Sequence, residues 1–298
     1  MDGIINVNKP LGITSHDVVY KLRKLLNIKK IGHTGTLDPD AQGVLPMCIG
    51  KGTKLAELLT ATDKQYLAEL TLGAITDTQD KSGNILETFS VNVDEEKIHS
   101  AVMNFIGEIE QIPPMYSAIK IDGKKLYELA REGKTVERKP RTVTVKNIQI
   151  EEIDLTRNTV TMLVDCTKGT YIRTLCEDIG KALGCGGYMS ALTRTKSGRF
   201  DIENAYTLSQ IEEMLAENDL SFFTPVHEAM PEYPKIILAE RNAKKVRYGI
   251  KIAVEGLEVG TTYRVFDEAN NFLVIARQGN EQLEILKTFY DGSQGKNN

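Results

Sequence analysis

The sequence is poor in the residues that build metal sites and disulfide frameworks. Its 298 residues include only four cysteines and four histidines. The cysteines (Cys48, Cys166, Cys176 and Cys185) form no Cys-x-x-Cys pair, and the histidines are scattered along the chain. This spacing argues against a zinc site and a disulfide framework, and it fits a reducing compartment. We therefore expect no bound metal.

Long hydrophobic runs are also missing. No segment approaches the ~18 consecutive apolar residues of a membrane-spanning helix. The first residues, Met1 to Asn6, lack the positively charged stretch that opens a signal peptide, so we expect a cytoplasmic protein. Charged residues make up 26% and hydrophobic residues 41% of the chain, which is typical of a folded globular protein. The length allows one large domain and one small domain.

The formal net charge of −4 hides stripes of one sign. Residues 113–146 hold nine Lys/Arg against four Asp/Glu, and residues 167–199 hold six against two. Residues 201–232 hold eight acids and no base. Local stripes, more than the total charge, set the field that a polyanion meets, so the basic stripes are compatible with RNA binding. Taken alone, each stripe could equally be an ordinary solvated surface.

The most distinctive segment runs from Gly32 to Gly43, with the sequence Gly-His-Thr-Gly-Thr-Leu-Asp-Pro-Asp-Ala-Gln-Gly. Three glycines, one proline and two aspartates predict a loop, neither a helix nor a central strand. Pro39 pushes Asp38 toward extended geometry. Apolar residues flank the segment on both sides, a pattern typical of a functional loop carried by a scaffold. A lone Asp-Pro would more simply be a turn between two buried elements.

Alternating strand and helix patterns surround this loop. Strands are predicted over residues 3–8, 64–72, 84–91, 141–154, 158–166 and 187–198. Helices are predicted over residues 15–26, 50–59, 94–106, 172–183 and 209–217, the first opened by a capping box between Thr14 and Asp17. Arg173 lies in the first turn of its helix, where the helix dipole disfavours a cation, so a partner elsewhere should hold it.

Two further regions lie outside this core. Residues 113–146 carry the first basic stripe, a hairpin signal at Asp122-Gly123 and a short amphipathic helix from Lys124 to Arg131, which indicates an excursion from the main sheet. Residues 231–291 show short strand patterns at 236–238, 251–254, 262–266 and 272–276, separated by turns. Residues 292–298 are expected to be disordered.

Four segments of this sequence resemble motifs of one enzyme family. Gly32 to Pro39, followed by Gly-Val-Leu-Pro at residues 43–46, resembles the catalytic motif of the bacterial tRNA pseudouridine synthases of the TruB family. Asp-Lys-Gln-Tyr at 63–66, Lys-Gly-Thr-Tyr-Ile-Arg at 168–173 and Leu-Thr-Arg-Thr at 192–195 resemble further segments of that family. The four segments stand in the family's order, and the resemblance covers nearly the whole chain.

The resemblance implies an α+β fold. Its main part would be a mixed, mainly antiparallel sheet with flanking helices and a mobile thumb insertion that closes over the RNA loop. A small C-terminal β-barrel similar to the PUA-type RNA-binding domain would follow. The implied catalytic domain spans residues 1–230, with the thumb at 113–146, and the implied PUA-like domain spans residues 231–291.

The implied reaction is the isomerisation of one uridine of tRNA, the T-loop uridine at position 55, to pseudouridine. The bond between N1 of uracil and C1′ breaks and C5 bonds to C1′, so no atom is lost and no cofactor is required. Because the target base lies in a folded loop, it must be flipped out of its stack. The implied partner is the T-arm of tRNA, and we expect a monomer.

The family's functional residues correspond to matching positions here. Asp38 would be nucleophile or general base, Tyr66 would stack on the target base, and Arg173 would be a bidentate, always-charged partner that keeps Asp38 ionised. His33 would fill the space left by the flipped base, and Leu192 would form part of the apolar wall of the uracil pocket. Further implied substrate contacts are Lys9, Thr36, Lys54 and Tyr171. The implied RNA contacts of the thumb are Lys120, Lys124, Lys125, Arg138, Lys139 and Arg141.

Two other functions are compatible with parts of the pattern. A tRNA folding factor, or RNA chaperone, would bind tRNA independently of any chemistry, but it would not need Asp38. A metal-dependent nuclease could use Asp38, Asp40 and Asp77, but their spacing is not that of a cluster of metal ligands.

Overall fold

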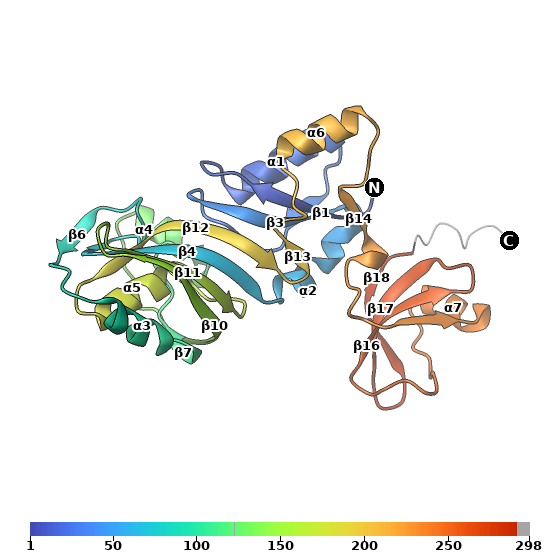
Figure 1. Cartoon of the computed structure of the whole chain (residues 1–298). Helices are drawn as coiled ribbons and strands as arrows, with labels where there is room; N and C mark the ends of the chain where they lie inside the picture. Colours follow the sequence, from blue (N-terminus) through green and yellow to red (C-terminus); the bar gives the residue numbers. More distant parts are fainter. Residues whose placement is uncertain (122, 291–298) are drawn as a thin grey trace.

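The computed structural model describes residues 1–121 and 123–290 (Figure 1). A long main sheet forms most of the molecule, and a smaller C-terminal sheet packs against one end of it. The main sheet has the strand order β14-β1-β3-β12-β4-β11-β10-β7, with β2 attached to β3 and β13 to β12. Its strands are β1 (Gly3–Lys9), β2 (Ile31–His33), β3 (Ala41–Ile49), β4 (Lys64–Leu72), β7 (Gly107–Gln111), β10 (Arg141–Asp154), β11 (Thr159–Cys166), β12 (Gly187–Ser197), β13 (Phe200–Asp201) and β14 (Phe223–Pro225).

The main sheet is mixed but mainly antiparallel, which confirms the expected α+β class. Its one parallel pair among the described strands joins β12 to β3. The flanking helices are α1 (Ser15–Leu26), η1 (Gly50–Leu55), α2 (Ala56–Thr60), α3 (Glu95–Met103), α5 (Ile172–Ala182), α6 (Leu208–Ala216) and η2 (Val226–Glu228). None of the helices in the described part of the chain has the length and apolar character needed to cross a membrane.

The local signals in the sequence explain where these helices begin. Thr14 and Asp17 form the capping box of α1, and Asp94 accepts a hydrogen bond from the backbone of Lys97 at the start of α3. One face of each helix then packs on the sheet. The apolar stripe of α5 meets the apolar face of β12 and β4 in one large core, whose buried members include Leu70, Leu175 and Ile179.

The strand β3 was not expected to begin where it does. The sequence predicted a loop up to Gly43, yet residues 41–43 already belong to β3, which lies between β1 and β12 in the middle of the sheet. Gly43 has φ +103°, and a Cβ atom there would stand 2.3 Å from the carbonyl oxygen of Arg194. Glycine is therefore present because β3 and β12 approach closely, and not because the chain turns.

An insertion leaves the main sheet between β7 and β10, and it covers most of the segment for which a thumb was predicted. It contains the short hairpin β8 (Lys120–Ile121) and β9 (Lys124–Lys125), followed by α4 (Leu126–Arg131). Asp122, at the expected hairpin turn, lies outside the described residues. The main sheet resumes at Arg141, where β10 pairs with β7, so residues 141–146 are part of the sheet. A second excursion, the hairpin β5 (Ala74–Thr76) and β6 (Ile85–Thr88), follows β4.

The C-terminal unit is a four-stranded sheet with one helix. Its strands are β15 (Lys235–Leu238), β16 (Thr262–Asp267), β17 (Phe272–Gln278) and β18 (Leu283–Thr288), and its helix is α7 (Glu240–Arg247). The sequence did not predict α7. The strand predicted at 251–254 is wrong, because that segment makes only an isolated bridge between Ile252 and Leu283. The PUA-like character of this unit stays a prediction, and the whole tail at 292–298 falls, like residue 291, outside the described residues.

Candidate functional site

The loop that carries Asp38 lies between β2 and β3 and is fastened at several points; we call residues 34–40 the Asp38 loop. The hydroxyl of Ser15, in the first turn of α1, donates to the carbonyl of Leu37 (3.1 Å) and accepts from its amide (2.8 Å). The amide of Ala41 donates to the carbonyl of Asp38, and that of Gly12 to the carbonyl of Pro39. The backbone around the carboxylate is thus held by α1 and by the start of β3.

Arg173 reaches the Asp38 loop from the first turn of α5. Its side chain is 7% exposed, and its Nε lies 3.2 Å from Oδ2 of Asp38. Its Nη1 lies 3.5 Å from Oδ2 of Asp80 and donates to the carbonyl of Thr78. Its Nη2 donates to the carbonyl of Tyr116, in the thumb insertion (2.8 Å). The expected bidentate pair with Asp38 is therefore wrong, because the guanidinium is shared between two carboxylates and two carbonyl groups.

Asp80 is the second carboxylate of this site and is held firmly in place. It lies in the turn between β5 and β6, with a side chain only 10% exposed. Its Oδ1 accepts hydrogen bonds from the hydroxyls of Thr78 (2.7 Å) and Ser82 (2.6 Å) and from the amide of Ser82. Its Oδ2 is left to face Arg173. Thus Asp80 fixes the end of the guanidinium that Asp38 does not contact.

The environment of Asp38 works against its ionisation. Burial raises the pKa of this carboxyl, and the charge of Asp80 raises it further. The charges of Arg173 and Lys9 act in the opposite direction. The side chain is still 40% exposed, so a substrate can reach it. Arg173 supports the ionised form as expected, but burial outweighs it.

Tyr66 and Leu192 come to the site on neighbouring strands. In the antiparallel pair of β4 and β12, Tyr66 stands opposite Arg194 and Leu192 stands opposite Ala68. Leu192 is 8% exposed and Tyr66 is half-buried against the same core. Burial raises the pKa of Tyr66, while the charge of Arg194 and a hydrogen bond from it lower this pKa; the charge of Asp38 also acts on the phenol. A phenol ring, an apolar wall and a carboxylate are therefore near one another.

Three further predicted substrate contacts, His33, Thr36 and Tyr171, lie in different surroundings. His33 ends β2 and accepts a hydrogen bond at Nδ1 from the amide of Gly35; burial and then the charge of Arg194 lower its pKa. Thr36 is exposed on the loop. Tyr171 precedes α5, with its backbone bound in both directions by the side chain of Gln111.

Two lysines are not placed as surface contacts. Lys9 is fully buried, and its ammonium donates to the carbonyl of Pro10 (2.8 Å) and, at 3.5 Å, to that of Pro39. Burial lowers the pKa of Lys9 to about 8. Lys54, in η1, donates to the carbonyl of Thr288 in the C-terminal unit (2.6 Å). Lys9 therefore holds the backbone of the Asp38 loop at Pro39, and Lys54 links the main unit to the C-terminal unit. Neither lysine presents a free ammonium to RNA.

The thumb residues lie on the insertion or at its base. Lys120, Lys124, Lys139 and Arg141 are exposed, whereas Lys125 and Arg138 are half-buried. Lys124 pairs with Glu132 at 3.8 Å, and Arg138 donates to the carbonyl of Pro113. The basic character of this stripe is thus partly balanced within the insertion.

Two residues of the site were missed in the sequence. Asp80 was given no role, since nothing in its local pattern shows that it faces Arg173. Arg194 was part of a recognised Leu-Thr-Arg-Thr segment but was given no role, although it is 1% exposed and donates to the carbonyls of Val44 and Gly35. A charged residue in the apolar alternation of a central strand was the signal that could have identified it.

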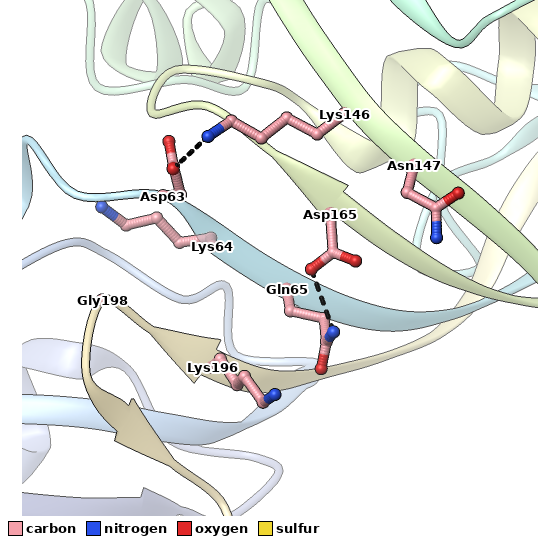
Figure 2. A pocket seen from close by; sticks show the side chains of 8 residues that line it. All are labelled: Asp63, Lys64, Gln65, Lys146, Asn147, Asp165, Lys196 and Gly198. Carbon is pink, nitrogen blue, oxygen red and sulfur yellow. Dashed lines mark hydrogen bonds and ion pairs between the residues drawn. The ribbon is translucent and has the colours of Figure 1, made fainter.

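A hollow lies next to the start of β4 (Figure 2). It has a volume of about 340 Å³ and lies where β4, β10, β11 and β12 approach one another. Lys146 pairs with Asp63 there, and Gln65 donates to Asp165. Gln65 and Tyr66 are consecutive residues of β4, so they point to opposite faces of the sheet. The hollow therefore belongs to the face turned away from Tyr66. The described residues contain no cluster of three or more potential metal ligands, here or elsewhere.

Comparisons with known proteins find matches over most of the chain. Residues 23–172 match the family model "TruB family pseudouridylate synthase (N terminal domain)", and residues 173–229 match "tRNA pseudouridylate synthase B C-terminal domain". The chain is 44% identical to the tRNA pseudouridine synthase B of Clostridium kluyveri, over 97% of this chain and 100% of that protein. It is 51% identical to that of Alkaliphilus oremlandii, over 85% and 83% of the two chains.

Solved structures give the same picture of the fold. A chain in the structure titled "Crystal Structure of a Cbf5-Nop10-Gar1 Complex" is 29% identical, with a TM-score of 0.76, over 98% of this chain and 86% of that one. A chain in the "Structure of H/ACA RNP bound to a substrate RNA containing 2'-deoxyuridine" is 27% identical, with a TM-score of 0.74, over 97% and 86%. The likeness extends over the main sheet and the C-terminal unit together.

Proposed function

We infer that this chain, which belongs to the TruB family of pseudouridylate synthases, isomerises a uridine of tRNA to pseudouridine. We further propose that the target is the T-loop uridine at position 55, held in the T-arm. The protein would act as a monomer in the cytoplasm. The four cysteines are buried free thiols, which supports a reducing compartment such as the cytoplasm.

The uridine would enter the site flipped out of its loop. An extruded base is held by stacking on an aromatic ring and by apolar contact, and Tyr66 and Leu192 offer these on adjacent strands. His33, at the end of β2, would fill the gap that the base leaves in the RNA. The thumb lysines and arginines would contact phosphates around the loop.

Asp38 would carry the chemistry. Once the base is seated, the carboxylate either attacks as a nucleophile or accepts a proton as a general base, and both roles require the ionised form. The bond from N1 to C1′ breaks, the uracil turns, and the bond from C5 to C1′ forms; the proton leaves C5, and one is taken up at N1. Arg173 favours the charged form of the carboxylate and fixes its direction, and Asp80 holds Arg173.

The observation that carries this proposal is the contact between Asp38 and a buried Arg173, near Tyr66. Keeping a carboxylate in a site whose burial opposes its charge is costly, and a protein that only binds RNA gains nothing from it. The test is Asp38→Asn, which keeps the size of the side chain and removes its charge. Pseudouridine in a T-arm hairpin should stay at background after long incubation, while tRNA affinity should be unchanged or slightly higher.

The control for this test is Asp40→Asn, because Asp40 is an exposed carboxylate on the same loop that faces no arginine in the described structure. It should convert the hairpin as the unmodified protein does. Full activity in Asp38→Asn would exclude this loop as the catalytic centre. If Asp38→Asn lost binding as well, its thermal unfolding would first have to match that of Asp40→Asn before the loss is assigned to chemistry.

A further inference from the structure

Arg194 is a buried cation that the proposed chemistry does not use. Its side chain is 1% exposed, and no carboxylate within residues 1–121 and 123–290 forms an ion pair with it. Arg173, the other buried arginine of the site, has two such partners. A charge removed from water without a counter-charge is expensive, so its contacts should show what it is for.

Two of these contacts hold the backbone on both sides of Asp38. Nε of Arg194 donates to the carbonyl of Val44 (2.7 Å), and Nη2 donates to the carbonyl of Gly35 (3.2 Å). Gly35 precedes Asp38 by three residues, and Val44 follows it within β3. The planar guanidinium can hold both carbonyls at once because its N–H groups diverge at fixed angles. One side chain therefore fixes the start of the Asp38 loop relative to β3.

The third contact is with Tyr66. Arg194 stands directly opposite Tyr66 in the pair of β12 and β4, so the two side chains share one face of the sheet. A hydrogen bond between Arg194 and the phenol is one of the influences on Tyr66. On its other side Arg194 stands opposite Gly43, where the lack of a Cβ lets β3 come close. Arg194 thus lies between the strand that carries Tyr66 and the loop that carries Asp38.

We propose that Arg194 is a positioning residue that fixes the phenol of Tyr66 relative to the Asp38 loop, so that ring and carboxylate meet the same uracil in the required geometry. It is buried and acts without touching the substrate. This inference rests on the proposed function for its effect on rate, but the placement of Tyr66 can be measured without any reaction.

The first experiment is a double-mutant cycle of Arg194→Gln and Tyr66→Phe in the full chain, with single-turnover conversion of a T-arm hairpin and hairpin affinity as readouts. Displacing reacting groups by about 1 Å costs about 100-fold in rate, so Arg194→Gln should slow conversion by that order with little change in affinity. In the Tyr66→Phe background, which lacks the hydroxyl, the same change should cost much less. If Arg194→Gln slowed conversion by the same factor in the unmodified protein and in Tyr66→Phe, the proposal would be overturned.

The second experiment follows Tyr66 directly. Tyrosines replaced by 3-fluorotyrosine each give a ¹⁹F resonance, and the one missing from Tyr66→Phe belongs to Tyr66. In Arg194→Gln the chemical shift of this resonance should change, and the phenol of residue 66 should titrate at higher pH. The reason is that a neighbouring cation that favours the phenolate is gone. An unchanged resonance and titration would overturn the proposal even if the reaction were lost. If instead the unmodified protein converted no hairpin while the resonance behaved as expected, the proposed function would fail and the placement would stand.

Matched variants separate positioning from stability. Lys196→Gln changes an exposed cation two residues along the same strand, and it should leave rate and resonance unchanged. Arg194→Lys keeps the charge but cannot hold two carbonyls and a phenol together. The pKa of the Tyr66 phenol should therefore return part of the way to its value in the unmodified protein, while the single-turnover rate should stay low. If Arg194→Gln did not fold, single-turnover conversion and the ¹⁹F titration would both be measured on Arg194→Lys. A conversion rate of Arg194→Lys equal to that of the unmodified protein would overturn the proposal.

Discussion

At the scale of single residues, the site depends on one guanidinium that two carboxylates share. A lysine at position 173 would keep the charge but could not contact Asp38, Asp80 and two carbonyls together. We expect Arg173→Lys to lower the single-turnover rate by about 100-fold, with RNA affinity nearly unchanged. Arg157→Lys is the matched control, because that exposed arginine makes a similar pair with Asp154 far from the chemistry. Equal rates in the two variants would contradict the role given to Arg173.

The pH dependence of the rate reports on the ionisation of Asp38. If Asp38 must be ionised, the rate falls as pH falls through its pKa, which burial has raised above the usual value for an aspartate. The charge of Arg173 lowers this pKa, so its removal in Arg173→Gln should raise the pKa further and move the acid limb of the profile to higher pH. The measurement is the single-turnover rate at saturating hairpin across the acid range. A limb that stays in place would show that the titrating group is not Asp38.

At the scale of elements, β3 and β12 approach each other closely at Gly43. Gly43→Ala would put a Cβ 2.3 Å from the carbonyl oxygen of Arg194 at a φ of +103°. We expect it to lower the free energy of unfolding by at least about 2 kcal/mol, measured by urea denaturation. Gly249→Ala is the control, since that glycine also has a positive φ but meets no atom within 4 Å. Similar losses in both variants would mean that φ alone, and not the contact between strands, determines the effect.

The thumb should act on RNA through phosphates. Neutralising Lys120, Lys124 and Lys139, which are exposed, should weaken tRNA binding and flatten its salt dependence. Each lost phosphate contact lowers the slope of log affinity against log salt by about 0.7–0.9. Lys97→Gln changes an exposed lysine of α3 that pairs with Asp94 of the same helix start, and it should leave the slope unchanged. A thumb variant with an unaltered slope would show that this stripe faces solvent in the complex.

The sequence predicted elements best where a local pattern determines them. The helix α1 follows its capping box, and β10 keeps its predicted bounds of Arg141 and Asp154. The start of β3 was missed because Gly43 was taken as a loop signal, although it serves a contact with a strand 150 residues later in the chain. The missed partners in the site have the same origin. Asp80 and Arg194 gain their surroundings only when distant segments meet, which no local pattern shows.

At the scale of the whole molecule, the two units share a small apolar core. Ile275 and Phe289 of the C-terminal unit are buried against Leu55 and Val226 of the main unit. Lys287 pairs with Glu57 across the same contact (3.0 Å). Removal of the C-terminal unit would expose this surface, and each apolar side chain buried there contributes about 1.5–3 kcal/mol. The C-terminal unit therefore stabilises the main unit as well as being a candidate RNA-binding surface.

A chain that ends at Glu228 should accordingly be less stable but still active. All residues proposed for the chemistry precede it, so a T-arm hairpin should be converted below the lowered unfolding temperature, while affinity for whole tRNA falls. Phe289→Ala in the full chain is the control, since it weakens the contact and keeps the unit. Complete loss of conversion by a truncated chain that remains folded would show that the C-terminal unit takes part in the chemistry.

The position of β12 in the sheet has a consequence for the synthesis and folding of the protein. Asp38 and Tyr66 are among the first parts of the chain to be synthesised, but the strand between their two strands is not yet there. At about 5–20 residues per second, the 150 residues that separate Val44 from Arg194 take roughly 8–30 s to be added. During that time the nascent chain holds the aspartate and the tyrosine on unconnected segments. If Asp38 and Tyr66 act as proposed, the growing polypeptide is inert toward tRNA until β12 emerges and closes the sheet.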